Sequence, residues 1–444
     1  MRGVIGIRKE TKDPTERRAP LTPQQVQQLV QQGIQVIVQP SENRIFKPGD
    51  YQQAGATIST ELNQANIILG VKEVPIPDLI PNKAFCFFSH TIKGQPFNMP
   101  MLQAILDQQI TLLDYELVVD DQGKRLIYFS NFAGYAGMID TLWALGRRLE
   151  WEGISTPFAT IQQAYQYPSL EAAKQAIKKV GDRIQTEGVP KALNPLIFAF
   201  TGRGHVSIAA QEIFALLPHQ TIEPEQIPEL VQCGKADPHK LYKAVFLKEH
   251  LYQPRNPNEP FSRETLQQRP ETYRNRFQEF LPYLTVIVNG IYWEPRFPRI
   301  VTREDLKQLF SGSFPRLRVI GDITCDIDGS IEVTVKPTTY KNPVYVYDVQ
   351  MDTVVNGWQG NGPVILAVDK LPTELPREAT EWFGQSLLPY VPELAMADYT
   401  LPYEELLRQL PPPFRPAIIA HQGALTPPFH YLYKELAQHA KQSK

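Results

Sequence analysis

Short hydrophobic runs alternate with helical patterns through the first 120 residues of the chain. The buried runs lie at residues 4–7, 36–38, 67–69, 85–88 and 111–113. Between the first two, Pro23 opens a helix whose apolar face contains Val26 and Leu29. Strands without a polar face, separated by helices, are typical of a parallel sheet that helices cover on both sides.

A second series of the same kind follows. Its buried runs lie at residues 196–200, 285–288, 318–320 and 364–368. Residues 220–280 are polar and rich in proline, which is typical of an insertion or a long surface loop, and residues 376–440 are mostly helical. The pattern predicts an α/β protein with two doubly wound, Rossmann-like domains and a cleft between them.

Composition narrows the class of protein. The chain has 444 residues, of which 42% are hydrophobic, and a formal net charge of −2. A near-neutral balance argues against a partner such as nucleic acid or a membrane surface. No run approaches 18 apolar residues, and the early charges do not fit a signal peptide. We therefore expect a cytoplasmic enzyme with small-molecule substrates; the sequence does not indicate its oligomeric state.

A glycine-rich loop lies between the strand at 196–200 and the helix that follows. It has the form Gly202-x-Gly204-x-x-Ser207, which lets the backbone approach a pyrophosphate at a helix N-terminus. Glu223 stands at the usual distance for an acid that binds ribose hydroxyls, which favours NAD, but its surroundings are a poor strand. A plain strand–helix turn without a ligand is the alternative.

Charged residues follow four predicted strands of the first domain, at the edge where open parallel sheets bind ligands. They are Arg18, Lys72, Glu73, His90, Lys93 and Glu116. Each alone could be a solvated or helix-capping charge, but together they favour a binding site. No metal site is predicted: Asp322, Asp326 and Asp328 lack the spacing of a calcium loop, and no Cys/His set has zinc spacing. Asp322 is instead expected near a nicotinamide.

These segments together resemble the lysine–2-oxoglutarate reductase family, the reductase half of aminoadipic semialdehyde synthase, and more distantly the lysine-forming saccharopine dehydrogenases. The matching stretches are 16–23, 69–75, 87–93, 114–116, 132–140, 288–294, 322–332 and 371–379. The resemblance implies condensation of L-lysine with 2-oxoglutarate and reduction of the imine to saccharopine. It implies NADP(H) as cofactor, against the weak argument from Glu223, with NAD(H) as the alternative.

The resemblance also implies roles for individual residues. Lys72 would take the proton from the substrate ammonium, and His90 would shuttle protons at the ketone oxygen. Glu73 and Glu116 would tune this pair. Binding of the substrate carboxylates is implied for Arg18, Lys93, Lys12 and Arg125. Cofactor binding is expected at Gly202, Arg203, Gly204, His205, Val206, Ser207, Glu223 and Asp322, with Arg203 as a partner for a 2′-phosphate.

The same resemblance predicts a discontinuous first domain. Residues 1–135 and 345–444 would form a substrate domain like the N-terminal domain of alanine dehydrogenase, and residues 136–344 a dinucleotide domain carrying the polar insertion. Three alternatives remain: an NAD-linked enzyme working in the lysine-forming direction, an alanine-dehydrogenase-like enzyme using ammonia, and a non-catalytic sensor of lysine or nucleotide. The physiological direction and the range of amine substrates are not readable.

Overall fold

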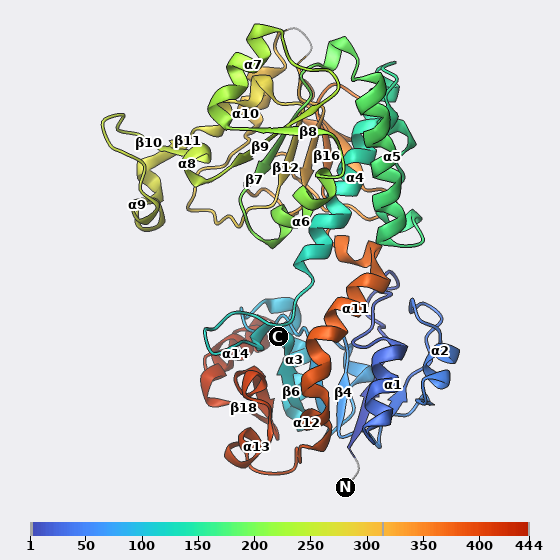
Figure 1. Ribbon diagram of the computed structural model, residues 1–444. Coiled ribbons are helices and arrows are strands. Elements are labelled where there is room, and N and C mark those ends of the chain that lie inside the picture. Colours follow the sequence, from blue (N-terminus) through green and yellow to red (C-terminus); the bar gives the residue numbers. More distant parts are fainter. Residues whose placement is uncertain (1–2, 313–314, 443–444) are drawn as a thin grey trace. The chain divides into compact units, whose positions relative to one another are not determined.

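The chain forms two compact units (Figure 1). The computed structural model describes residues 3–312 and 315–442. Unit 1 combines residues 1–129 with residues 376–444, and unit 2 contains residues 130–375. Unit 1 is made of two chain segments, as the predicted substrate domain is, but the boundaries lie at 129/130 and 375/376 rather than at 135/136 and 344/345. The reason is that the strands between residues 344 and 366 pair within the sheet of unit 2.

Unit 1 is built on an eight-stranded sheet with the order β18-β17-β6-β5-β4-β1-β2-β3. Its strands are β1 (Val4–Ile7), β2 (Gln35–Val38), β3 (Thr57–Ile58), β4 (Ile67–Leu69), β5 (Ala84–Phe87), β6 (Thr111–Asp114), β17 (Ile418–His421) and β18 (Ala424–Leu425). The first six pair in parallel, whereas β17 and β18 are antiparallel additions from the C-terminal segment. The parallel sheet predicted from the buried runs is therefore confirmed.

Seven helices of unit 1 accompany this sheet among the described residues. They are α1 (Pro23–Gln31), α2 (Pro48–Gln53), α3 (Met99–Asp107), α11 (Pro376–Leu387), α12 (Val391–Met396), α13 (Tyr403–Gln409) and α14 (Leu432–Gln442). Helix α1 begins where Pro23 predicts it, because Thr22 and Gln25 form a capping box at its start. Val26 and Leu29 lie on the face of α1 that packs into the hydrophobic core beside the sheet, as the apolar pattern predicts.

Unit 2 is built on a second eight-stranded sheet, with the order β15-β14-β16-β13-β12-β7-β9-β8. Its strands are β7 (Ile197–Thr201), β8 (His219–Ile222), β9 (Leu241–Phe246), β12 (Val286–Asn289), β13 (Val319–Asp322), β14 (Val344–Asp348), β15 (Thr353–Asn356) and β16 (Val364–Leu366). Its helices are α4 (Ser130–Trp151), α5 (Leu170–Glu187), α6 (His205–Phe214), α7 (Ile227–Cys233), α8 (Lys248–Leu251), α9 (Arg263–Gln268) and α10 (Arg303–Leu309). Strand β14 pairs antiparallel with both β15 and β16, and the other neighbouring strands described in this sheet pair in parallel.

The polar insertion predicted at residues 220–280 is wrong in its first half. Strand β9 pairs with β7 along five residues, and β8 pairs with β9, so both belong to the central sheet. Only the segment after β9 leaves the sheet, as the hairpin of β10 (Tyr252–Pro254) and β11 (Tyr273–Asn275) with α9 (Figure 1). Strand β8 is difficult to predict from the sequence because its first three residues are not fully buried, so it lacks a continuous apolar run.

Two glycines allow the long helix α4 to pack closely within unit 2. A Cβ at Gly134 would lie 2.3 Å from the carbonyl oxygen of Val206 in α6, and one at Gly137 would meet Ile323 at 2.7 Å.

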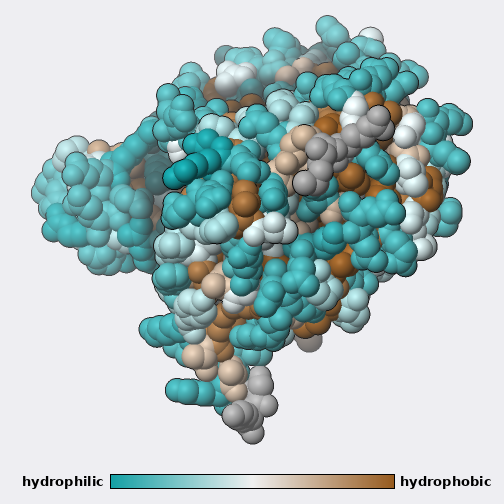
Figure 2. All heavy atoms as spheres, turned by 90° about the horizontal axis from the view of Figure 1, so that it is seen from below, coloured by the Kyte–Doolittle hydropathy of each residue, from teal (hydrophilic) through white to brown (hydrophobic). Residues whose placement is uncertain are grey.

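None of the helices in the described part of the chain is both long and apolar enough to span a membrane. The face of the molecule in Figure 2 is mostly hydrophilic, with hydrophobic side chains scattered between polar ones.

Candidate active site

The predicted charged residues of unit 1 follow four neighbouring strands, β6, β5, β4 and β1, at their carboxyl ends. In this order they are Glu116, His90, Lys72 with Glu73, and Lys12 with Arg18. The chain runs from β1 to β2 on one side, whereas β4 lies on the other side of β1. Such a reversal is the position at which open parallel sheets bind ligands, so these residues form a candidate active site.

His90 and Lys12 both contact the carboxylate of Glu73. The distance from Glu73 Oε1 is 2.8 Å to His90 Nδ1 and 2.8 Å to Lys12 Nζ. Burial raises the pKa of Glu73, but the hydrogen bonds from His90 and Lys12 outweigh it and lower the pKa to about 2. The His90 side chain is 34% exposed, so the imidazole is partly accessible from the solvent. Its backbone has a positive φ of 49°, a strained conformation that often occurs at functional sites.

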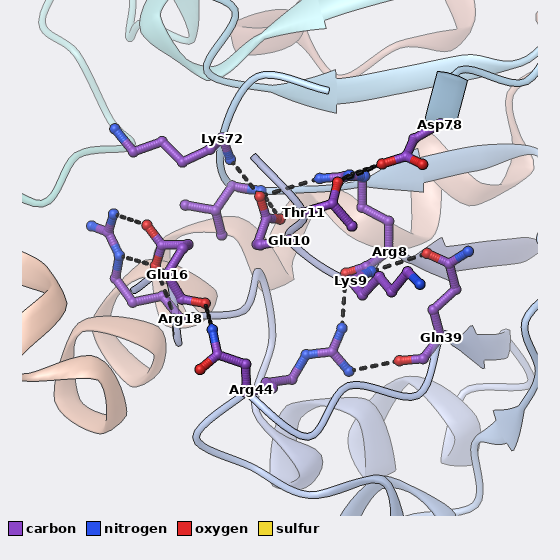
Figure 3. A network of polar contacts seen from close by, with 12 residues as sticks. Arg8, Lys9, Glu10, Thr11, Glu16, Arg18, Gln39, Arg44, Lys72 and Asp78 are labelled. Carbon is purple, nitrogen blue, oxygen red and sulfur yellow. Dashed lines mark hydrogen bonds and ion pairs between the residues drawn. The ribbon is translucent and has the colours of Figure 1, made fainter. Parts of the chain in front are cut away.

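A buried carboxylate, Glu10, holds the backbone of the segment that carries Lys72 (Figure 3). Its two oxygens accept hydrogen bonds from the N–H groups of Val71 at 2.8 Å and Lys72 at 3.0 Å. Arg8 pairs with Glu10 at 3.2 Å. Glu10 is not among the residues predicted from the sequence, although it follows β1 and the same strand-end position applies to it.

Arg18 lies in a buried ion pair with Glu16 rather than at an open surface (Figure 3). Its Nε and Nη2 donate to the two Glu16 oxygens at 2.7 and 2.6 Å. Burial opposes ionisation of Glu16, yet the Arg18 guanidinium lowers the pKa of this carboxyl below its usual value. The positive charge of Lys72 also lowers the pKa of Glu16, by a smaller effect than Arg18.

Phe88 connects the remaining predicted groups with His90. The Arg125 guanidinium lies 5.3 Å from the Phe88 ring centre, and the His90 ring stacks on the same phenyl ring at 6.3 Å. Arg125 Nη1 is 3.7 Å from Glu116 Oε1, so these two predicted residues are neighbours. Lys93 is exposed in a turn, and the structure does not bring it into contact with the other predicted residues.

The glycine-rich loop of unit 2 has the geometry of a phosphate-binding turn. Gly202 has a φ of 76°, a conformation that favours glycine, and Ser207 Oγ donates to the Gly202 carbonyl at 2.9 Å. A Cβ at Gly204 would meet no atom within 4 Å, so the space before the N-terminus of α6 is open. A dinucleotide pyrophosphate fits this open space and the helix dipole.

A cavity of about 520 Å³ adjoins this loop. It is lined by Gly202, Arg203, Gly204, Leu247, Lys248, Leu251, Arg263, Gly290, Ile291 and Tyr292. The loop follows β7 and Gly290 follows β12, and the strand order reverses between these two strands. The cavity therefore occupies the ligand-binding position of a doubly wound sheet. Of the other predicted cofactor residues, His205 is exposed and Val206 half-buried in the first turn of α6.

Two predicted cofactor residues lie elsewhere. Glu223 follows β8 at the edge of the sheet, separated from β7 by β9, and does not line the cavity. Asp322 ends β13 but is 1% exposed, and its oxygens accept hydrogen bonds from Asn289, Thr324 and Thr334. These bonds give Asp322 a role in holding strand ends together. In the described part of the chain, no group of three or more His, Cys, Asp or Glu could hold a metal ion.

Two family models match the chain. The N-terminal domain of alanine dehydrogenase/PNT matches residues 6–136, and the C-terminal domain matches residues 273–428. The alpha-aminoadipic semialdehyde synthase of Arabidopsis thaliana is 38% identical over 97% of this chain and 41% of its own length. The mitochondrial alpha-aminoadipic semialdehyde synthase of Bos taurus is also 38% identical, over 99% of this chain and 49% of its own length. The chain thus spans about half the length of these relatives.

More distant similarities cover whole proteins. The saccharopine dehydrogenase [NAD(+), L-lysine-forming] of Neurospora crassa is 29% identical over 87% of this chain and 90% of its own length. A solved L-alanine dehydrogenase has a TM-score of 0.61 at 18% identity and covers 98% of this chain and 99% of its own. A transhydrogenase from Sinorhizobium meliloti has a TM-score of 0.53 at 16% identity, over 96% of this chain and all of its own. These two structures confirm the predicted fold class.

Proposed function

The chain belongs to the family of the alpha-aminoadipic semialdehyde synthases and lysine-forming saccharopine dehydrogenases, and on this basis we propose that it is a lysine–2-oxoglutarate reductase. It would condense the ε-amine of L-lysine with the ketone of 2-oxoglutarate and reduce the resulting imine to saccharopine. A bound NADPH supplies the hydride for this reduction. Family membership confirms the resemblance predicted from the motifs; the activity and the substrates are our proposal.

The contact of His90 with Glu73 carries this proposal. A carboxylate with a pKa of about 2 stays ionised at every physiological pH, so Glu73 favours a proton on His90 Nδ1. The second ring nitrogen of His90 is then the atom that exchanges protons with the substrate. Condensation needs such a group, because the ketone oxygen must gain protons before it leaves as water.

We assign removal of the substrate's ammonium proton to Lys72. The hydrogen bond from its N–H group to Glu10 fixes its backbone, and its side chain is half-buried (Figure 3). A positioned base is required because only an unprotonated amine can attack the ketone carbon. Lys12 and Arg125 are the best placed of the predicted carboxylate binders, since both side chains are more than one-third exposed and each contacts another predicted site residue, Glu73 and Glu116 respectively. Arg18 is 4% exposed, and its Nε and Nη2 are already bound by Glu16, so it is less accessible to a substrate carboxylate.

The test follows NADPH absorbance in purified protein with lysine and 2-oxoglutarate, with each substrate omitted in turn. Lys72→Met and His90→Gln should lower kcat at least about 100-fold, the usual contribution of a general acid or base, and leave the thermal midpoint unchanged. Lys124→Met and His239→Gln remove the same groups at exposed positions and serve as controls. Full rates in both site variants would refute the assigned roles.

The same assay distinguishes the proposed reaction from the alternatives. Oxidation of NADPH with pyruvate and ammonia, but not with lysine and 2-oxoglutarate, would identify an alanine-dehydrogenase-like enzyme. Nucleotide binding without turnover of any substrate would identify a sensor. A clear preference for NADH would identify the NAD-linked alternative. The mammalian relatives are named mitochondrial, whereas the sequence predicts a cytoplasmic location for this chain. Microscopy of the tagged protein in its own cells tests this prediction.

A further inference from the structure

The strand beside the glycine-rich loop is not the one that comes next in the chain. In the usual dinucleotide fold, with the order 3-2-1-4-5-6, the second strand neighbours the first and ends near the ribose 2′-hydroxyl. Here β8 follows α6 in sequence, but β9 lies between β8 and β7. Glu223 is thus two strands from the loop, or about 10 Å to the side at the usual strand spacing. The ribose-proximal position falls instead at the end of β9.

The end of β9 carries a cation. The pairing of Thr201 with Phe246 aligns the last residues of β7 and β9, so Leu247 and Lys248 come beside the glycine loop. Both residues line the 520 Å³ cavity, as do Arg203 from the loop and Arg263 from α9. Among the described residues that line this cavity, three are cations and none is an Asp or Glu. A ribose hydroxyl alone needs no such charge, whereas a phosphate dianion does.

We propose that Lys248, Arg263 and Arg203 form a subsite for the 2′-phosphate of NADP(H). The proposal rests on the proposed nicotinamide-dependent function, and it names the residues that select between the two cofactors. All three side chains are exposed, so solvent-borne ligands can reach them. Lys248 Nζ lies 5.6 Å from the centre of the buried Phe297 ring, a contact that a bound phosphate would replace. The subsite explains how the chain can bind NADP(H) although Glu223 stands at the sequence distance from the glycine-rich loop that usually favours NAD.

Glu249 gives the subsite a built-in competitor. Its Oε2 lies 3.4 Å from Arg263 Nη2, so part of the Arg263 charge is neutralised in the absence of a ligand. A phosphate would compete with this carboxylate for the same guanidinium. Glu249→Gln should therefore release Arg263 and strengthen binding of a 2′-phosphate, while Lys248→Ala and Arg263→Ala should weaken it.

The experiment measures calorimetric dissociation constants for two probes, adenosine 2′,5′-bisphosphate and adenosine 5′-monophosphate. Lys248→Ala and Arg263→Ala should each weaken the bisphosphate about 10-fold and change the monophosphate less than about 2-fold, as expected for loss of one charge-assisted contact. Glu249→Gln should strengthen the bisphosphate about 3-fold. Arg269→Ala, an exposed arginine outside the cavity with the same change of charge, is the matched control.

An equal loss for both probes would overturn the subsite, because the cations would then bind the 5′-phosphate. Unchanged affinities in all variants, or the same loss in Arg269→Ala, would overturn it as well. Failure of the proposed function is a separate result: a wild-type protein that prefers the bisphosphate but does not oxidise NADPH with lysine and 2-oxoglutarate retains the subsite and refutes the reaction.

Discussion

Asp140 in α4 and Glu374 in the short helix Leu371–Glu374 form a buried carboxyl pair within unit 2. Their exposed fractions are 0% and 3%, and no Lys, Arg or His of the described residues forms an ion pair with either. Burial raises the pKa of Asp140 to about 7. Burial and the Asp140 charge raise the pKa of Glu374 well above its usual value. We expect the pair to hold at least one proton near neutral pH.

The effect on stability follows from the direction of these shifts. Asp140 binds a proton more tightly in the folded than in the unfolded chain, where its pKa is 3.8. The stabilisation is therefore complete below about pH 4 and is lost as the pH rises towards 7. One extra bound proton changes the free energy of unfolding by about 1.4 kcal/mol per pH unit, so the loss of the Asp140 proton should lower this free energy by about 2 kcal/mol between pH 5 and 7. Glu374 acts in the same direction.

The perturbation is the double variant Asp140→Asn, Glu374→Gln, which keeps the shapes and removes both titrations. Between pH 5 and 7, the free energy of unfolding should fall in the wild type by at least about 2 kcal/mol more than in the double variant. The double variant should therefore be the more stable of the two proteins at pH 8. Urea unfolding followed by tryptophan fluorescence measures this, because Trp143 and Trp358 are in contact within unit 2. Glu229→Gln, at an exposed carboxyl of α7, is the control. The same pH dependence in wild type and double variant would refute the reasoning.

Two further predictions concern the proposed site. Glu73→Gln removes the charge that contacts both His90 and Lys12, so kcat should fall about 10-fold or more in the lysine and 2-oxoglutarate assay, run well below the thermal midpoint. The thermal midpoint at neutral pH should fall as well, because the lowered pKa of Glu73 means that its ionised form stabilises the fold. An unchanged kcat would contradict the role of Glu73. Gly204→Ala adds a Cβ that meets no protein atom, so the fold should persist while NADPH binding weakens about 10-fold in calorimetry, because the methyl group takes the space of the pyrophosphate. Gly49→Ala, another glycine with open space around it, should change neither quantity.

Most of the fold can be predicted from the sequence because buried strands and capped helices are local patterns. The runs at 4–7 and 85–88 contain β1 and β5, and Pro23 marks the start of α1. Strand order is a different kind of property, since it depends on which long-range pairings form. That is why β8 and β9 were mistaken for a polar insertion, and why the boundary at 345 placed β14 to β16 with the wrong unit.

The same distinction applies to the candidate site. The carboxyl ends of parallel strands meet at one edge, so the sequence alone indicates that Lys72, Glu73 and His90 lie together. It does not indicate which charges neutralise one another. Arg18, predicted to bind a substrate carboxylate, is already paired with Glu16 in a buried contact, and removing a buried partner is costly. Recognition of the substrate carboxylates should therefore depend first on exposed cations such as Lys12. The carboxylate that Lys12 contacts, Glu73, also contacts His90. A carboxylate bound at Lys12 would compete with Glu73 for that ammonium, which couples substrate binding to the group that orients His90.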